Sequence, residues 1–258
     1  MQTEPYIQPM QTPDDKPILC IVGPTGAGKT HLAMSLAAYA KSIGRTLELI
    51  SMDSALVYRG LDIGSAKPSK AEQAAVIHHL IDILDPTEVY SAARFAKDAK
   101  RLCEDIRNRG NIPVVVGGTM LYWRAWAYGL STLPTANSEI RLRLEEEAKQ
   151  IGWPAMHAKL AQVDPETALR LKPNDSQRIQ RALEVFTISG KPMSALLADS
   201  PSDDGREGST IPSWINLVSL EPSDRKRLHQ QLEKRFDEML LAGFLDEVRS
   251  LKANTALH

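Results

Sequence analysis

The stretch ILCIVGPTGAGKT, residues 18–30, decides the fold. Its first five residues form a continuous apolar run, which is typical of a strand buried on both faces of a parallel sheet. The Ala- and Leu-rich segment Lys29–Lys41 that follows predicts a helix. The residues between strand and helix fit the phosphate-binding pattern G-x-x-x-x-G-K-[ST]: Gly23, Pro24, Thr25, Gly26, Ala27, Gly28, Lys29 and Thr30.

This pattern predicts a phosphate loop for physical reasons. Glycines let the backbone curl so that several N–H groups converge on one anion, and the N-terminus of the helix adds its positive dipole end. Lys29 supplies a point charge, and the Thr30 hydroxyl can hold Mg²⁺. A glycine-rich turn with a chance lysine is the alternative, but the flanking strand and helix disfavour it. We therefore expect a di- or triphosphate ligand.

The rest of the chain predicts a P-loop NTPase-like α/β core with a helical insertion. Leu47–Ser51, Ile112–Val116 and Trp214–Leu220 are expected strands, and Ser91 is an expected N-cap of a helix that ends before Gly110. Strands that alternate with helices imply a parallel sheet. Further helices are expected over Ser138–Gln150, Trp153–Gln162, Ser176–Ile188 and Arg225–Leu241. We therefore divide the chain into a flexible tail (1–16), a core (17–133 and 213–258) and a helical insertion ending in a flexible loop (134–212).

Composition excludes several classes of protein. The 258 residues carry a net charge of −1, with 43% apolar and 24% charged residues, as in an ordinary globular protein. No apolar run approaches the ~18 residues that span a bilayer, and no signal pattern opens the chain. Two cysteines make no disulfide framework, so we expect a cytoplasmic protein. The near-zero charge argues against mainly electrostatic nucleic-acid binding, although local patches remain open.

Two further strand ends carry side chains that suit catalysis. Asp53 follows the second expected strand, and Thr119 follows the strand that ends at Gly117 and Gly118. Ligands of an open parallel sheet lie outside the carboxyl ends of its strands, so both residues are expected beside the phosphate loop. Asp53 can take a proton from a nucleophile or coordinate Mg²⁺ through water, and Thr119 can donate a hydrogen bond. A solvated loop aspartate and a plain strand-to-helix turn are the alternatives.

Several other residues have simpler interpretations. We expect His78 and His79 to be a surface or core pair rather than a metal site. The aromatic residues Trp123 and Trp126 favour a core over a stacking platform.

Several strings together resemble the tRNA dimethylallyltransferase (tRNA isopentenyltransferase) family. Beside the phosphate loop they are DSALVYRG (53–60), DIGSAKP (62–68), HHLIDI (78–83), VGGTMLY (116–122), PNDSQRIQRALEV (173–185), Arg235-Phe236 and Gly243-Phe244. The resemblance spans about residues 18 to 252. It implies transfer of a dimethylallyl group from dimethylallyl diphosphate to N6 of the adenosine 3′ to the anticodon, with Mg²⁺ and release of diphosphate. It also implies a monomer.

The resemblance implies a role for each matching residue. Asp53 is expected to be the base, and Thr119 and Arg235 are expected to stabilise the leaving diphosphate. The insertion is expected to grip the anticodon stem, and the target adenine must leave its stack to react. The residues expected to contact tRNA are Asp53, Ser54, Ala55, Leu56, Thr119, Arg141, Gln177, Arg178, Ile179, Gln180 and Arg181.

The chain departs from the family at its end, and two other functions remain possible on sequence. Family members usually continue for several tens of residues beyond the position of His258, with an arginine-and-glycine motif that helps hold tRNA. A P-loop small-molecule kinase with Asp53 as its base would turn over ATP without RNA. A non-catalytic, nucleotide-dependent RNA-binding module would keep its activities in an Asp53→Ala variant.

Overall fold

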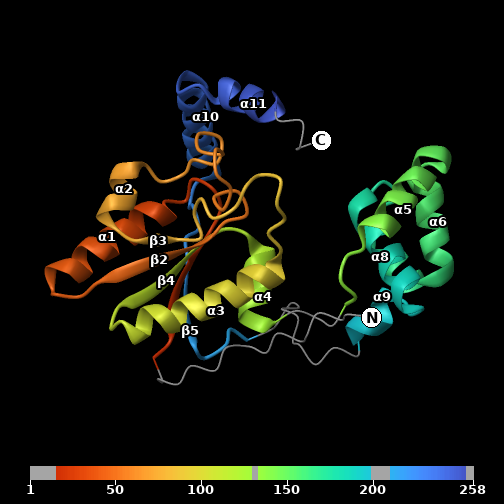
Figure 1. Cartoon of the computed structure of the whole chain (residues 1–258), viewed down its shortest axis with the longest axis horizontal. Coiled ribbons are helices and arrows are strands. Elements are labelled where there is room, and N and C mark those ends of the chain that lie inside the picture. The colour runs from red at the N-terminus through yellow and green to blue at the C-terminus, as the bar shows by residue number, and fades with distance from the viewer. Residues whose placement is uncertain (1–15, 130–132, 199–209, 254–258) are drawn as a thin grey trace. The chain divides into compact units, whose positions relative to one another are not determined.

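The computed structural model describes residues 16–129, 133–198 and 210–253. These residues form two compact units, one of residues 133–198 and one of residues 16–129 together with 210–253 (Figure 1). The predicted tail (1–16) and the predicted flexible loop within the insertion lie almost entirely outside the described residues.

The larger unit is built on a five-stranded parallel sheet with the order β3-β2-β4-β1-β5. Leu19 pairs with Val114, Met52 with Gly117 and Val22 with Ser219, so the carboxyl ends of four strands meet at one edge. The prediction of a parallel α/β sheet is confirmed. The strands are β1 (Ile18–Val22), β2 (Leu47–Met52), β3 (His78–His79), β4 (Ile112–Gly117) and β5 (Ile215–Ser219).

Helices cover both faces of this sheet. The buried alanines of α1 (Lys29–Ser42) pack on Ile21, Leu47, Leu49 and Val114, which share one face because side chains alternate along a strand. Glu48 faces the other way and meets Arg109, the C-cap of α3 (Ala92–Asn108). The predicted cap is confirmed, since the Ser91 side chain accepts a hydrogen bond from the Arg94 N–H. The other helices of this unit are α2 (Lys70–Ala75), α4 (Met120–Tyr128), α10 (Arg225–Leu241) and α11 (Phe244–Ala253).

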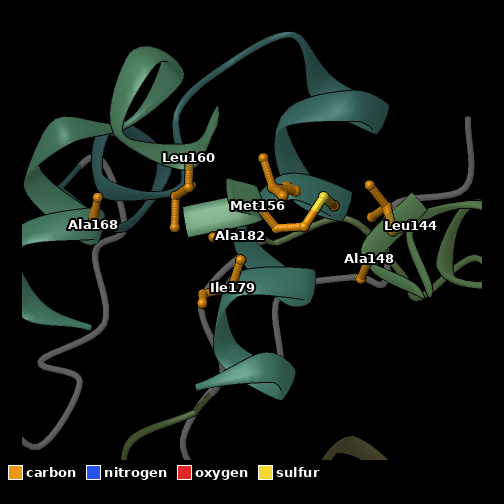
Figure 2. Close-up of a cluster of buried hydrophobic side chains, with 8 residues drawn as sticks. Leu144, Ala148, Met156, Leu160, Ala168, Ile179 and Ala182 are labelled. Carbon is orange, nitrogen blue, oxygen red and sulfur yellow. The ribbon is translucent and has the colours of Figure 1, made fainter. Parts of the chain in front are cut away.

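The smaller unit is helical and has its own core. Met156, Leu160, Ile179 and Ala182 are fully buried at its centre (Figure 2). Burial of such side chains contributes about 1.5–3 kcal/mol each for the larger ones, so the unit has its own source of stability. Its helices are α5 (Ser138–Ile151), α6 (Trp153–Val163), α7 (Pro165–Arg170), α8 (Ser176–Ser189) and α9 (Met193–Ala198).

The structure also shows elements that the sequence pattern did not predict. Strand β3 and the short helices α2, α4, α7, α9 and α11 are additions to the predicted set. Trp126 is buried and its ring meets that of Trp214 edge to face at 4.9 Å between centroids, so it belongs to the core. Among the described residues no helix is long and apolar enough to cross a membrane.

Candidate active site

The phosphate loop connects β1 to α1, as the sequence predicts. Gly23 has φ +146°, and a Cβ there would lie 2.5 Å from the Leu220 carbonyl oxygen, so only glycine fits beside the end of β5. The Ala27 N–H donates to the Pro24 carbonyl oxygen at 3.2 Å and closes the loop. Helix α1 then begins at Lys29, with its N-terminus at the loop. This is the geometry that gathers backbone N–H groups around an anion.

Lys29 shows that three charged groups share this site. Its Nζ donates to the carbonyl oxygens of Gly23 and Pro24, each at 2.8 Å. Burial lowers the pKa of Lys29, the nearby Asp53 carboxylate acts in the opposite direction, and the Arg235 guanidinium lowers the pKa further. The pKa of Lys29 thus responds to charges on Asp53 and Arg235, which are far from it in the sequence.

Asp53 stands directly after β2, and a tight turn fixes one of its oxygens. Asp53 Oδ1 accepts hydrogen bonds from the N–H groups of Ala55 at 2.8 Å and Leu56 at 3.4 Å. These bonds fix the orientation of the carboxylate, and Oδ2 takes no part in them. A carboxylate held in this way can accept a proton from a nucleophile that approaches the strand ends.

Thr119 joins the end of β4 to the turn that carries Asp53. Its Oγ1 accepts from the Ser54 N–H at 3.2 Å, and its own N–H donates to the Met52 carbonyl oxygen at 3.3 Å. The strand ends are also packed too closely for a side chain at Gly117, where a Cβ would lie 2.0 Å from the same Met52 oxygen. A Cβ at Gly118 would lie 3.6 Å from Lys29 Nζ. The structure thus brings Asp53, Thr119 and Lys29 together.

Helix α10 packs on the phosphate loop and carries Arg235 into a neighbouring pocket. Leu228 and Leu232 of this helix pack on the phosphate loop, since a Cβ at Gly26 would lie 3.1 Å from a methyl carbon of each. Further along the helix, Arg235 lines a pocket of about 460 Å³ between α10 and the loop that leads to α2. The pocket is lined by Asp62, Ile63, Ala66, Lys67, Pro68, Ser69, Lys70, Gln73, Arg235, Glu238, Met239 and Ala242.

The predicted tRNA contacts of the helical unit are partly engaged in internal bonds. Arg141 and Arg181 both pair with the fully buried carboxylate of Glu184. The Ile179 side chain is completely buried in the unit's core. Arg178 pairs with Asp175 at 2.9 Å but keeps 74% of its side chain exposed.

Glu184 is a buried acidic residue of this unit that the sequence pattern did not single out. Burial would raise the pKa of its carboxyl, but the hydrogen bonds from Arg141, Arg181 and the Asn137 N–H outweigh burial and hold the pKa below its ordinary value. A charged Glu184 therefore joins α5 to α8. Beside these helices lies a hollow of about 320 Å³, lined by Glu145, Ala148, Lys149, Trp153, Ser176, Gln177 and Gln180.

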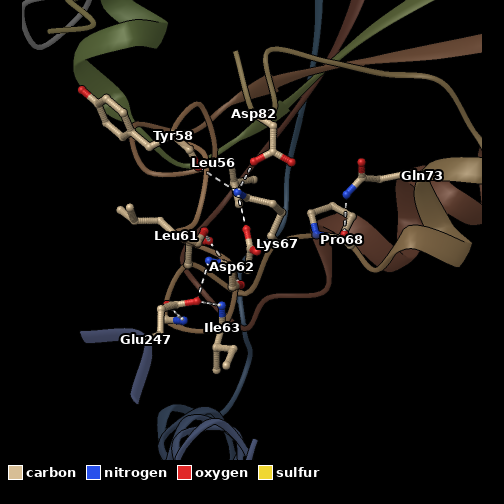
Figure 3. A network of polar contacts seen from close by, with 12 residues as sticks. Leu56, Tyr58, Leu61, Asp62, Ile63, Lys67, Pro68, Gln73, Asp82 and Glu247 are labelled. Carbon is tan, nitrogen blue, oxygen red and sulfur yellow. Dashed lines mark hydrogen bonds and ion pairs between the residues drawn. The ribbon is translucent and has the colours of Figure 1, made fainter. Parts of the chain in front are cut away.

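A second network was also missed, in the segment after Asp53. Figure 3 shows Lys67 at the centre of this network and Glu247 at its lower edge, where it contacts the backbone near Ile63. Lys67 is only 4% exposed, and its ammonium contacts Asp62, Asp82 and the Tyr58 carbonyl oxygen. The string DIGSAKP (62–68) carries part of the family resemblance, but nothing in it predicts a buried Lys67, because a lysine after three small residues suggests an exposed loop.

The remaining question at this site is which residues could hold a metal ion. In the part of the chain that the structure describes, no group of three or more His, Cys, Asp or Glu side chains could hold a metal ion. His79 instead contacts the buried Glu48 at 2.6 Å, and His78 contacts the Val76 carbonyl oxygen at 2.7 Å. Thr30 stands exposed at the start of α1, next to Lys29. One protein hydroxyl together with substrate phosphates and water fits the way Mg²⁺ is usually held.

Comparison with known proteins gives a consistent result. A family model described as IPP transferase matches residues 56–258. A tRNA dimethylallyltransferase of Polynucleobacter asymbioticus is 84% identical over 258 residues, which are 100% of this chain and 78% of that protein. One of Paraburkholderia phymatum is 54% identical over 244 residues, 94% of this chain and 74% of that protein.

Solved structures agree with the sequence relatives. The tRNA isopentenylpyrophosphate transferase of Bacillus halodurans has a TM-score of 0.54 and 36% identity, and the match covers 93% of this chain and 71% of that one. A eukaryotic dimethylallyltransferase captured acting on tRNA has a TM-score of 0.71 and 29% identity, over 92% of this chain and 56% of that one.

Proposed function

The chain belongs to the IPP transferase family, and we infer that it transfers a dimethylallyl group from dimethylallyl diphosphate to tRNA. The acceptor is N6 of the adenosine 3′ to the anticodon. One observation supports this function most directly: the phosphate loop, Asp53 and Thr119 meet at the carboxyl ends of the strands, and α10, which carries Arg235, packs on the phosphate loop. The relatives' names favour this reaction over a small-molecule kinase, which the loop alone would also allow.

The reaction needs a base and a stabilised leaving group. The N6 amine attacks C1 of the dimethylallyl group, and the bond from C1 to the diphosphate oxygen breaks with its electron pair on the diphosphate. In our proposal Asp53 Oδ2 accepts the proton that N6 loses, because the turn bonds hold only Oδ1. The amine is a weak nucleophile while its lone pair is delocalised into the ring, so proton removal must accompany attack.

Fixed positive groups would stabilise the departing diphosphate. The proposed donors are the backbone N–H groups of residues 23–30, Lys29 and Arg235, with Thr119 at the neighbouring strand end. Such preorganised donors usually make the largest contribution to catalysis. Lys29 would exchange its two loop carbonyls for phosphate oxygens when the donor substrate binds. Mg²⁺, held by the Thr30 hydroxyl and the diphosphate, would neutralise further negative charge.

The helical unit is our proposed grip on the anticodon stem-loop. Its exposed polar residues Gln177 and Arg178 are the best placed of the predicted set to reach RNA. Arg141 and Arg181 would act through their bonds to Glu184 as supports for that surface, and the exposed parts of their side chains can add phosphate contacts. A tRNA substrate also implies a cytoplasmic protein, and we expect a monomer in gel filtration.

The test is transfer of labelled dimethylallyl diphosphate to an anticodon stem-loop. An Asp53→Asn variant keeps the size of the side chain but removes the base, so we expect a loss of two or more orders of magnitude in rate. Asp105→Asn, on the outer side of α3, is the matched control and should retain full activity. A stem-loop with purine riboside, which lacks the N6 amine, should accept no label. RNA-independent ATP turnover with a small acceptor would favour the kinase instead.

A further inference from the structure

Three consecutive backbone N–H groups converge on one carboxylate near the active site. Asp62 and Ile63 donate to Glu247 Oε2 at 2.8 and 2.7 Å, and Gly64 donates to Oε1 at 3.0 Å. Glu247 belongs to α11, more than 180 residues further along the chain. Hydrogen bonds to an ionised group are shorter and about twice as strong as neutral ones. A single side chain therefore fastens the last described helix to the loop behind Asp53.

The ring of Phe244 adds an apolar contact between α11 and the same loop, residues 62–64. A Cβ at Gly64 would lie 2.3 Å from Phe244 Cε2, so the ring packs directly on the glycine backbone. Phe244 also meets Phe236 of α10 edge to face, with 6.3 Å between ring centroids. Helix α11 thus contacts residues 62–64 through both the Phe244 ring and the Glu247 carboxylate. Together these two contacts define one orientation of α11 on the loop.

The loop that Glu247 holds is itself tied to the turn that carries Asp53. Lys67 Nζ donates to the Tyr58 carbonyl oxygen at 2.8 Å and to Asp62 Oδ1 at 2.6 Å, and it also contacts Asp82. The Asp82 N–H in turn donates to the Leu56 carbonyl oxygen at 3.1 Å. Leu56 belongs to the turn that holds Asp53 Oδ1. A continuous set of hydrogen bonds therefore leads from Glu247 to the proposed base, and Figure 3 shows its part from Glu247 through Lys67 to Asp82.

Arg235 belongs to α10, the helix that directly precedes α11. Helices α10 and α11 are separated only by residues 242 and 243, and Gly243 has φ +99°. Arg235 on α10 faces Asp62, Ile63 and Lys67 across the pocket of about 460 Å³. Fastening α11 to the loop therefore also fixes α10 against the pocket's other wall.

We propose that Glu247 is a positioning residue for the transfer reaction, which holds Arg235 in register with Asp53 by fastening α11 to residues 62–64. This inference rests on the proposed function. Donors to a leaving group act only when they are placed before the reaction, and a 1 Å displacement can cost about a hundredfold in rate. Without Glu247 the pair α10–α11 loses its polar attachment, and Arg235 loses its fixed distance from the base.

The test compares Glu247→Ala and Glu247→Gln with the wild type in the stem-loop assay. Gln keeps the shape but puts an NH₂ group against a backbone N–H, so both variants should lose kcat by about tenfold to a hundredfold. KM for both substrates should change by less than about threefold, since the phosphate loop and the helical unit are untouched. Asp246→Ala is the matched control, because Asp246 is 79% exposed and pairs only with Arg249 among the described contacts.

A double-variant cycle separates positioning from general damage. If Glu247 acts through Arg235, Glu247→Ala should cost less than about twofold in an Arg235→Ala background, whereas independent losses would multiply. Hydrogen exchange of residues 59–67 should accelerate in Glu247→Ala while exchange in β1 and β4 stays unchanged. The positioning role would be overturned if the losses of the two single variants multiply in the double variant. It would also be overturned if Glu247→Ala keeps the wild-type kcat. A wild type that transfers nothing would instead overturn the proposed function, so the two failures are distinguishable.

Discussion

Replacing Glu184 by glutamine should destabilise the helical unit by about 3 kcal/mol. The carboxylate accepts four hydrogen bonds: from the Asn137 N–H at 2.7 Å, from Arg141 Nε and Nη2 at 3.0 and 3.2 Å, and from Arg181 Nη1 at 2.7 Å. Glutamine keeps one acceptor oxygen, so two bonds to one oxygen are lost and an NH₂ group faces a guanidinium. At ~1.5–3 kcal/mol for each bond to a charged group, this loss is about 3–6 kcal/mol.

The lower end of that range applies because water can reach both arginines. The side chains of Arg141 and Arg181 are 43% and 29% exposed, so hydrogen bonds to water replace part of the bonds to Glu184 that they lose. Urea unfolding at pH 7, followed by hydrogen exchange in α5 and α8, measures the change in this unit separately from the sheet. Glu146→Gln, an exposed acid on the same helix as Arg141, is the control and should change stability by less than about 0.5 kcal/mol.

The loss of stability in Glu184→Gln should also depend on pH, and it should become smaller in acid. The folded-state pKa of Glu184 is lowered, so its stabilisation is complete above the unfolded pKa of about 4.3 and is lost as pH falls through the lower folded value. The difference between wild type and Glu184→Gln should therefore shrink below about pH 4. A difference under about 1 kcal/mol at pH 7, or one that grows in acid, would refute the reasoning.

Three further predictions concern the larger unit. Gly117→Ala should lower kcat at least about tenfold, because the new Cβ would lie 2.0 Å from the Met52 oxygen and displace the strand end that carries Asp53; steady-state kinetics checks this. Lys29→Ala should weaken binding of inorganic diphosphate at least about tenfold in calorimetry, and equal affinity would remove Lys29 from the site. Cys103 should resist alkylation at pH 8 until the protein unfolds, because burial raises its pKa to about 12; rapid labelling of the native protein would contradict its buried position.

Local sequence signals predicted the elements that local chemistry determines. β1 and α10 match their expected bounds, Ile18–Val22 and Arg225–Leu241. An uninterrupted apolar run predicts the strand, and apolar residues every four positions, from Leu228 to Leu240, predict the helix. The turn glycine Gly110 has φ +77°, as the end of the preceding helix requires. The capping box of α2, Ser69 with Glu72, is a further local signal, since this pair of residues marks the start of a helix.

Elements that depend on distant partners could not be found in this way. β3 has only two residues, and it exists because His78 and His79 pair with Leu49 and Ile50 of β2. Glu184 resembles any surface glutamate of an amphipathic helix, and its burial follows from the packing of α5 against α8. The assigned roles of Asp53, Thr119, Arg235 and the tRNA contacts stay predictions until the variants are measured.

The strand order has a consequence for how this protein is made on the ribosome. β5 fills the place beside β1, yet roughly 200 residues separate the end of β1 from the end of β5. At ~5–20 residues per second, that distance corresponds to about 10–40 s of synthesis. The helical unit is synthesised within this interval, and after β4 has paired with β1 the other side of this apolar strand still has no partner until β5 is made. An unpaired apolar strand edge invites aggregation, so nascent chains should depend on chaperones most strongly in this interval.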